Sequence, residues 1–583
     1  MKSRTSFFDV TILKKDITRF APVWALYTIF GTLVLLTLNR TPGEMASEIA
    51  GLAGVFAPIS FGYALVCALL LFGDLFVPRM CNALHSLPLR REGWFLTHTA
   101  AGLLFSIVPN ALLCGGAAMM MAPYGKVALL WFASAELEYL FFFGIAAFAA
   151  LCTGSRLGMA AVYGIVNFFS TLIYGLIEIL YLPLLKGVVL DQDVFVTFSP
   201  ILRMSDVSLI PGEYHYEKNV FVLQKLPREL WLYLGVCAGI GVVFAALALL
   251  IYRRRQLETA GDFIALKPVA PVFLVLYTLL CGAFFYTVAD VAAGGLEYVF
   301  LAVGIAVGFF TGRMLLDRTV KVFTGKSFAW FGILVAVLLG SIIVTVLDPL
   351  GITTYIPKAE DVRSVNMREG YYGGGPVDSF TAEDPEQIGT VIRAHELLLN
   401  ENIGKDDDTY LLTLQYRLKN GRTVTREYDA VRGGEATQVL KKQLSSAEYL
   451  FRTSDWEKYV ADVTDIDMVV YSNAPEKDSL KLRLVYNTWE YDEEAQKALV
   501  VRDGYQFTED GLTVVLTRKQ VTELMAAVKA DCDAGNMAQN VHTGNSSGYV
   551  SINTDNFRSV YLDYYPDCTN ITRFADAILA ANP

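Results

Sequence analysis

Long apolar runs follow one another at short intervals through the first part of the chain and stop near Asp348. A hydrocarbon core about 30 Å thick requires roughly 20 apolar residues per helix, so runs of this length predict transmembrane helices. The pattern predicts a polytopic α-helical membrane protein with about nine transmembrane helices and a C-terminal domain outside the bilayer. The runs are Phe20–Leu38, Gly51–Gly73, Thr97–Met121, Tyr139–Cys152 (longer if Val127–Phe132 joins it), Leu157–Tyr181, Leu230–Ile251, Val269–Val288, Leu296–Phe310 and Phe328–Leu347.

The C-terminal domain, residues 348–583, alternates helix-like and strand-like patterns, which predicts an α+β fold. Leu411–Leu418 and Thr423–Ala430 alternate apolar and polar residues around an Asn-Gly turn, a strong β-hairpin signal. Helices are expected on either side, at Asp384–Asn400 and Ala436–Leu444. A similar order recurs later, which suggests two related modules. The later segments are the helix Lys519–Asp531, the strands Gly548–Ile552 and Arg558–Tyr565, and the helix Asn570–Leu579.

The charge distribution follows the same division. The chain is 18% charged, against about 25% for a typical soluble protein. Residues 1–350 carry 24 Lys and Arg and 21 Asp and Glu, a net of +3, whereas residues 351–583 carry 24 and 37, a net of −13. The acidic domain argues against nucleic-acid binding, which needs a basic surface.

Basic residues predict the orientation in the membrane, because cytoplasmic loops carry an excess of Lys and Arg. The N-terminus and every second loop after it are basic, whereas residues 39–50 offer only Arg40 and residues 289–295 offer none. The N-terminus is therefore expected in the cytoplasm. Nine crossings would place the C-terminal domain outside the cell, and an error of one span would reverse its side.

Residues 6–20 place Val10, Leu13, Ile17 and Phe20 on one helical face. This pattern fits a helix that lies in the membrane interface. It fits equally well a polar lead-in to the first span.

Four acidic residues, Glu138, Glu178, Asp290 and Glu297, fall toward the expected outer ends of their spans. Ionisable residues are costly in lipid and usually face a cavity or the headgroup water. One interpretation is an acidic outer vestibule that favours cationic substrates. The other is four independent residues at the interface.

The sequence offers little other chemistry. Cys532 and Cys568 could form a disulfide if the domain faces an oxidising compartment. The five histidines have no partners at metal-ligand spacing, so no metal site is expected. Thr324–Ser327 resembles the end of a phosphate-binding loop, but Val320 stands where that loop needs glycine. No cofactor is expected on this chain, and we expect that it is not an enzyme.

Two cytoplasmic segments have distinctive sequences, the loop His85–Phe95 and the stretch Arg253–Gly261. Pro88 can open a short helix, with Arg90, Arg91 and Glu92 facing the cytoplasm and the aromatic residues that follow at the interface. Such a segment can press against a cytoplasmic partner. A plain positive-inside loop is the alternative.

Together with the leader Phe7–Trp24, these segments resemble an ABC-type export permease of the type 2 class, in a Gram-positive family with an added C-terminal extracytoplasmic domain. The resemblance covers about the first 265 residues well. It implies that the leader is an elbow helix and that a separate subunit binds ATP and Mg²⁺. It also implies a second permease subunit. The implied coupling-helix residues are His85, Leu87, Pro88, Arg90, Arg91 and Glu92.

The expected organisation is an elbow helix over 1–19, a six-span unit over 20–265, three further spans over 266–347 and the domain over 348–583. The three further spans depart from the basic six-span pattern of the family. A long outer loop at 182–229 is expected to pack on the domain. The expected function is a multi-pass plasma-membrane permease that couples ATP hydrolysis by its partner to export of, or resistance to, an amphiphile or peptide. The alternative is a non-transporting membrane sensor whose outer domain binds a ligand and signals to a cytoplasmic partner.

Overall fold

The chain forms two compact units in the computed structural model. One consists of Met1–Pro183 and Leu190–Val344, and the other of Leu184–Val189 and Thr345–Pro583. The structure describes residues 8–38, 41–86, 90–190, 192–292, 295–370, 379–404, 407–451, 453, 455–471, 482–486, 505–508, 511–543, 545–554 and 559–581.

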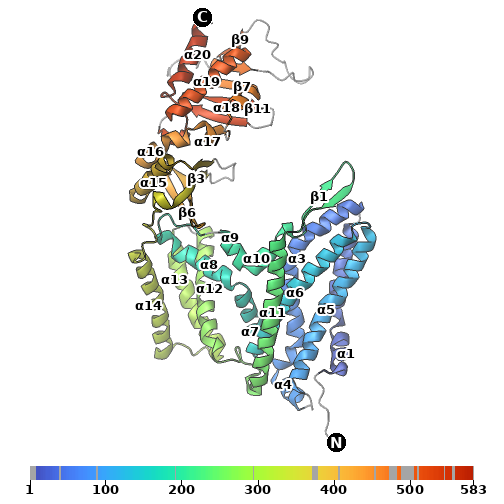
Figure 1. Cartoon of the computed structure of the whole chain (residues 1–583). Coiled ribbons are helices and arrows are strands. Elements are labelled where there is room, and N and C mark those ends of the chain that lie inside the picture. The colour runs from blue at the N-terminus through green and yellow to red at the C-terminus, as the bar shows by residue number, and fades with distance from the viewer. Residues whose placement is uncertain are drawn as a thin grey trace. The chain divides into compact units, whose positions relative to one another are not determined.

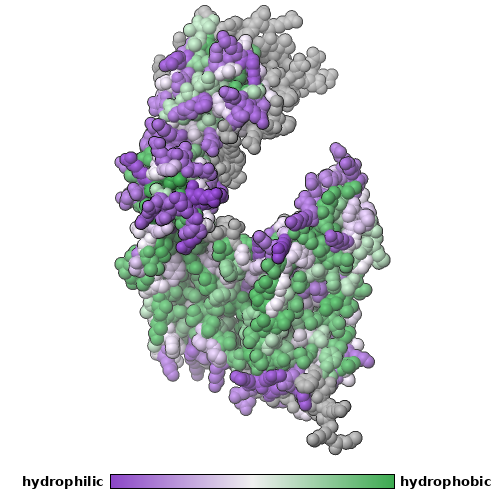
Figure 2. Space-filling view, viewed as in Figure 1, coloured by the Kyte–Doolittle hydropathy of each residue, from purple (hydrophilic) through white to green (hydrophobic). Residues whose placement is uncertain are grey.

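The first unit is helical, and its surface carries a broad hydrophobic region with hydrophilic residues at its ends (Figure 2). Seven helices in the described part of the chain are long and apolar enough to cross a membrane, or up to nine if each of two bent pairs is one span. The seven are α3 (Pro42–Leu71), α5 (Arg91–Met120), α6 (Gly125–Cys152), α11 (Arg228–Arg254), α12 (Val269–Ala292), α13 (Glu297–Asp317) and α14 (Gly325–Leu347). The bent pairs are α1 (Val10–Arg19) with α2 (Ala21–Thr37), and α7 (Arg156–Asn167) with α8 (Phe169–Leu180). Each of the nine predicted apolar runs falls on one of these helices or pairs.

The pair α7–α8 is bent by 64°, yet it connects opposite ends of the helical unit (Figure 1). Just before α7, Gly154 N donates to the carbonyl of Asp262 in the loop after α11. Just after α8, Tyr181 Oη lies 2.7 Å from the hydroxyl of Ser341, which is far along α14. The pair therefore traverses the unit once.

Helix α6 forms the centre of the first unit, and every residue from Phe141 to Ala147 is buried. Its closest neighbour is α11. A Cβ atom on Gly144 would lie 2.0 Å from the carbonyl oxygen of Gly241, and one on Gly241 would lie 2.5 Å from that of Leu140. Only glycine permits this approach of two helix backbones.

The leader forms the helix expected there, α1, and turns by 56° into α2. Its residue Asp16 is buried and bonds to His98 of α5. Helix α1 is thus anchored by a buried polar contact as well as by Leu13 and Ile17. The Thr324–Ser327 segment caps α14, since Thr324 Oγ1 accepts from Ser327 N at 3.3 Å.

The second unit contains two sheets with separate hydrophobic cores. The first sheet has the strand order β4-β3-β5-β6 and is antiparallel throughout. Helices α15 (Pro385–Asn400) and α16 (Glu435–Leu444) belong to its module. Its strands are β3 (Val362–Gly370), β4 (Ser379–Ala382), β5 (Thr409–Leu418) and β6 (Thr423–Val431).

The second sheet has the order β12-β11-β7-β8-β10-β9. Its strands β8, β7, β11 and β12 pair antiparallel in the same succession as β4, β3, β5 and β6. Both modules therefore run strand, strand, helix, strand, strand, helix, and β9–β10 is an addition beside β8. The second module comprises β7 (Val463–Val470), β8 (Leu482–Tyr486), β9 (Tyr505–Thr508), β10 (Gly511–Val515), α19 (Arg518–Ala534), β11 (Gly548–Thr554), β12 (Ser559–Tyr564) and α20 (Thr569–Ala581). The short helices α17 (Ala447–Phe451) and α18 (Trp456–Ala461) join the two modules.

The segment Leu184–Val189, far away in sequence, completes the first module. Val188 bridges to Arg426 of β6, and Glu427 N donates to the carbonyl of Gly187 at 3.1 Å. Lys186 Nζ donates to the carbonyls of Leu399 and Glu401 at the end of α15.

The expected packing of the loop 182–229 on the domain is thus correct only for these six residues. The later part of this loop forms α9 (Gln192–Phe198), α10 (Pro200–Met204) and a hairpin of β1 (Gly212–His215) and β2 (Val220–Leu223), which belong to the first unit.

Candidate functional site

A short amphipathic helix, α4 (Pro78–His85), lies between α3 and α5. Its Cys81 is buried, whereas Arg79 and Met80 are exposed, as is Val77 just before it. Val77, just before α4, and Met80, within it, are exposed apolar side chains at a basic end of the unit, and together they form a surface that a partner can contact. We call Val77–Met80 the α4 surface.

Arg91 fixes the start of α5 to the end of α11. Its guanidinium donates to the carbonyl oxygens of Tyr252, Arg253 and Arg255, at 3.1, 3.3 and 2.9 Å. The same guanidinium lies over the Tyr252 ring. Carbonyls at the last turn of a helix have no partner within the helix, so Arg91 acts as a C-cap for α11.

The structure gives the segment after Pro88 contacts within the helical unit that differ from the expected positions of its side chains. Arg91 and Glu92 were expected to face the cytoplasm, but Arg91 caps α11 and Glu92 pairs with Arg253 at 3.1 Å. Trp94 and Phe95 were expected at the membrane interface, but both are buried in the helical unit. Of the other implied coupling residues, His85 ends α4 and Arg90 precedes α5, while Leu87 and Pro88 lie outside the described residues.

Arg255 ties three helix ends together beneath the α4 surface. It is buried, and it donates to the carbonyls of Ala150 and Leu151 at the end of α6 at 3.0 and 3.3 Å. It also donates to the carbonyl of Leu75, after α3, at 3.4 Å. Nothing in the run of three consecutive arginines indicates that one of them is buried. The two segments that carried the family resemblance, around Arg91 and Arg255, are thus in direct contact.

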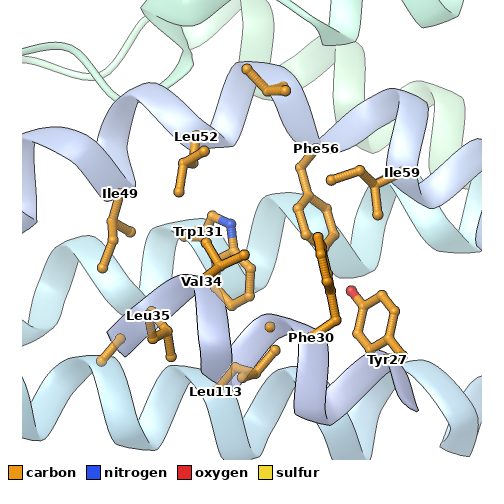
Figure 3. A pocket seen from close by; sticks show the side chains of 13 residues that line it. Tyr27, Phe30, Val34, Leu35, Ile49, Leu52, Phe56, Ile59, Leu113 and Trp131 are labelled. Atoms are coloured by element: carbon orange, nitrogen blue, oxygen red, sulfur yellow. The ribbon is translucent and has the colours of Figure 1, made fainter. Parts of the chain in front are cut away.

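The second feature is an apolar cavity of about 110 Å³ between α2, α3, α5 and α6 (Figure 3). Phe30, Val55 and Ile59 line the cavity and are also exposed at the surface of the helical unit, so the cavity opens to that surface. Tyr27 carries a hydroxyl at one end of it. The lining residues are Tyr27, Phe30, Gly31, Val34, Leu35, Ile49, Leu52, Val55, Phe56, Ile59, Leu113, Ala117 and Trp131.

Tyr27 links this cavity to a polar network inside the helical unit. Its hydroxyl donates to Asn110 Oδ1 at 2.8 Å, and Asn110 Nδ2 donates to Glu136 Oε1 at 2.8 Å. Ser106 Oγ also donates to Glu136 Oε1, at 2.9 Å. Asn110 of α5 therefore connects α2 and α6 through its side chain. Glu136 was not singled out from the sequence, although it stands two residues before Glu138 in the same apolar run.

Glu138 occupies a different place from the one expected. Because α6 starts at Gly125, Glu138 lies halfway along the helix and not at its outer end. Its side chain is fully buried, with Ser60 Oγ of α3 at 3.5 Å from Oε2. Its Oε1 atom has no hydrogen-bond partner among the described residues.

The other three acidic residues of the expected vestibule are in different surroundings. Glu178 near the end of α8 and Asp290 in α12 are exposed, and Glu297 caps the turn before α13 by accepting from Gly295 N. Glu138 therefore differs from them in both position and burial. The vestibule interpretation does not describe Glu138.

The described part of the chain shows no group of three or more His, Cys, Asp or Glu side chains that could hold a metal ion. Cys532 and Cys568 are both buried free thiols, so the proposed disulfide is not formed in this structure. The thiol of Cys568 donates to the carbonyl of Asn536 at 3.0 Å, and burial raises its pKa to about 12. A buried thiol of this kind is unreactive.

Comparison with models of known protein families gives no match, and no curated protein is similar in sequence to this chain.

Proposed function

We propose that this chain is the permease subunit of an ATP-driven exporter, coupled through its α4 surface to a separate ATP-binding subunit. Its cargo would be an amphiphile or a peptide, and a second permease subunit would complete the transporter. The observation that carries the proposal is the exposed α4 surface together with the hydrogen-bonded helix ends beneath it, which we call the base. Arg91 and Arg255 join the ends of α3, α5, α6 and α11 directly beneath this surface.

To transmit force from the partner to the membrane helices, α4 must be connected to several helix ends, and the base provides this connection. A partner that pushes on α4 would move several helix ends together, because their carbonyls share two arginines. Packed helices respond to small displacements as rigid bodies. The cavity beside Tyr27 is lined by α2, α3, α5 and α6, and the last three of these helices have ends that the two arginines join. A change in the spacing of these helices would therefore change the shape of the cavity.

The topology of the chain supports the expected location of its parts. Leu184–Val189 and the C-terminal domain belong to one unit and would therefore lie on one side of the membrane. Four long apolar helices, α11 to α14, separate them in the chain, and four is an even number of crossings. Before Leu184 the helices α2, α3, α5, α6 and the pair α7–α8 make five, an odd number that favours a domain on the side opposite the N-terminus. With the basic loops in the cytoplasm, the domain would be extracellular.

The test is co-purification of the full chain with the ATP-binding subunit and measurement of ATP hydrolysis. We expect Met80→Glu to reduce the stimulation of hydrolysis by about tenfold or more, because a carboxylate would enter an apolar contact. The matched control is Val320→Glu, a change of an exposed apolar residue in the loop between α13 and α14. Arg91 is unsuitable for this test because its loss would disturb the fold itself.

Two outcomes would reject the proposal: no ATP-binding chain co-purifies, or Met80→Glu stimulates hydrolysis as well as the wild type does. The sensor alternative is favoured by Leu184–Val189, which connects α8 directly to the domain by a few residues. A sensor would bind its cytoplasmic partner through the same surface without ATP hydrolysis that depends on Met80.

A further inference from the structure

We propose that Glu136 and Glu138 recognise the cationic head group of an amphiphile whose apolar part occupies the cavity beside Tyr27. The proposal rests on the transport function above and names its substrate class. Three observations lead to it: the charge balance of four helices, one unsatisfied carboxylate oxygen, and the continuity of the network with the cavity.

The charge balance concerns α2, α3, α5 and α6. Residues 21–39, 41–78, 92–125 and 127–155 contain no lysine or arginine. Arg91 at the first residue of α5 and Lys126 at the second residue of α6 are the basic residues of these helices, and both lie at helix ends. The two carboxylates, both near the middle of α6, therefore have no lysine or arginine beside them along the four helices. A charged side chain at membrane depth is costly and is usually paired or placed at a ligand pathway. A cationic ligand would supply the missing positive charge.

The hydrogen bonds of the two carboxylates point to a missing donor. Glu136 Oε1 accepts from Ser106 and Asn110, which are neutral groups. Glu138 is fully buried, and its Oε1 accepts from no described residue. Buried polar atoms are satisfied in the great majority of structures, so a buried carboxylate oxygen without a donor needs an explanation. An ammonium or guanidinium group of a ligand is such a donor.

The cavity supplies the place for the apolar part. Twelve of the thirteen lining residues have apolar or aromatic side chains, and the thirteenth is Gly31. Among these side chains only those of Tyr27 and Trp131 carry a polar atom. In Figure 3 Tyr27 lies at one end of the cavity, beside Ile59. Its hydroxyl begins the chain Tyr27, Asn110, Glu136. An apolar pocket with a few polar groups at one end is the usual form of a site for an amphiphilic ligand.

The experiment uses the full chain in nanodiscs of phosphatidylcholine, with empty nanodiscs as background. Binding of dodecyltrimethylammonium is compared with that of a neutral polyoxyethylene dodecyl ether, which has the same apolar chain. Isothermal titration calorimetry gives both affinities. Wild type should bind the cation at least about tenfold more tightly, as expected for a charge-assisted hydrogen bond. The variants Glu136→Gln and Glu138→Gln, singly and together, should lose this preference and keep the affinity for the neutral ether.

The matched control is Glu178→Gln, which removes an exposed acidic residue of α8 and should leave the preference unchanged. Glu136→Asp retains the charge and should retain most of the preference, which separates loss of charge from loss of fold. The proposal is overturned if wild type shows no preference, or if the double variant keeps it. Since the assay contains no ATP-binding subunit, its failure would leave the coupling experiment with Met80→Glu as an independent test.

Discussion

Arg253 and Arg255, at the end of α11, make very different contributions to the stability of the helical unit. Arg253 forms an ion pair with Glu92 in which both side chains are partly exposed, and such pairs contribute about 0–1 kcal/mol. Arg255 is buried, and three carbonyl oxygens depend on it. Leaving a buried acceptor without its donor costs about 1–3 kcal/mol per group. The stability of the base below α4 therefore depends mainly on Arg255 and Arg91.

The first module of the C-terminal domain contains a buried histidine that makes its stability depend on pH. His395 of α15 lies between Tyr416 and Tyr428, with ring nitrogens 2.9 and 2.8 Å from their hydroxyls. Burial, and to a smaller extent Arg426, lower the pKa of His395 from 6.5 to about 4. The unfolded chain takes up a proton below pH 6.5 and the folded module does so only near pH 4. We therefore expect the module to lose about 3 kcal/mol of stability as the pH falls through this window.

Urea unfolding of the full chain at several pH values, read by pulse proteolysis, measures this dependence. His395→Gln should unfold at lower urea at neutral pH, because it fits the two tyrosines less well. Between pH 6.5 and about 4, the stability of this variant should nevertheless fall less than that of the wild type. Equal slopes for both proteins would show that another group is responsible.

At the scale of elements, α6 and α11 cross with their backbones in close contact. Gly144→Ala would place a methyl group against the backbone of Gly241, and Gly241→Ala would place one against Leu140. Overpacking of this kind costs about 1–3 kcal/mol or more, because neither backbone can yield locally. Both variants should lower the melting temperature and the yield of monodisperse protein. Small residues at such contacts are what allow membrane helices to approach closely.

The control for this prediction lies on the same helix. A methyl group added at Gly239 of α11 would meet no atom within 4 Å, so Gly239→Ala should be tolerated. A similar loss in all three variants would mean that α11 is sensitive to alanine in general and not to the crossing.

Most helices and strands could be predicted because their patterns are local. The hairpin around Asn420 is an example, since alternation and an Asn-Gly turn are both visible in the sequence. The start of α6 was placed too late because Glu136 and Glu138 interrupt the apolar run. Those carboxylates are accommodated by Ser60, Ser106 and Asn110 on other helices. Only the tertiary structure contains that information, and the same is true of Arg91 at the end of α11.

At the scale of the whole molecule, the number of crossings decides which side the domain occupies. We expect Asn420→Cys, in the exposed turn between β5 and β6, to react with a membrane-impermeant maleimide in intact cells. Val320→Cys, between α13 and α14, should react only after permeabilisation. Seven of the eight native cysteines are buried and Cys281 is only partly exposed, so the background should be low.

If Asn420→Cys reacted only after permeabilisation, an even number of crossings would precede the domain. One of the two bent pairs, α1–α2 or α7–α8, would then not be a single span. The proposed export function would need revision, because the domain would share a compartment with the ATP-binding subunit.

The placement of Leu184–Val189 has a consequence for the order in which the protein is assembled. Val188 leaves the ribosome 238 residues before Arg426, its partner in β6 (426 − 188 = 238). At about 5–20 residues per second, this interval is roughly 10–50 s of synthesis. During that time α11 to α14 must be inserted into the membrane. The first module can therefore close only after the last helix of the membrane part has been made, and its closure requires that Leu184–Val189 and β6 have reached the same side of the membrane.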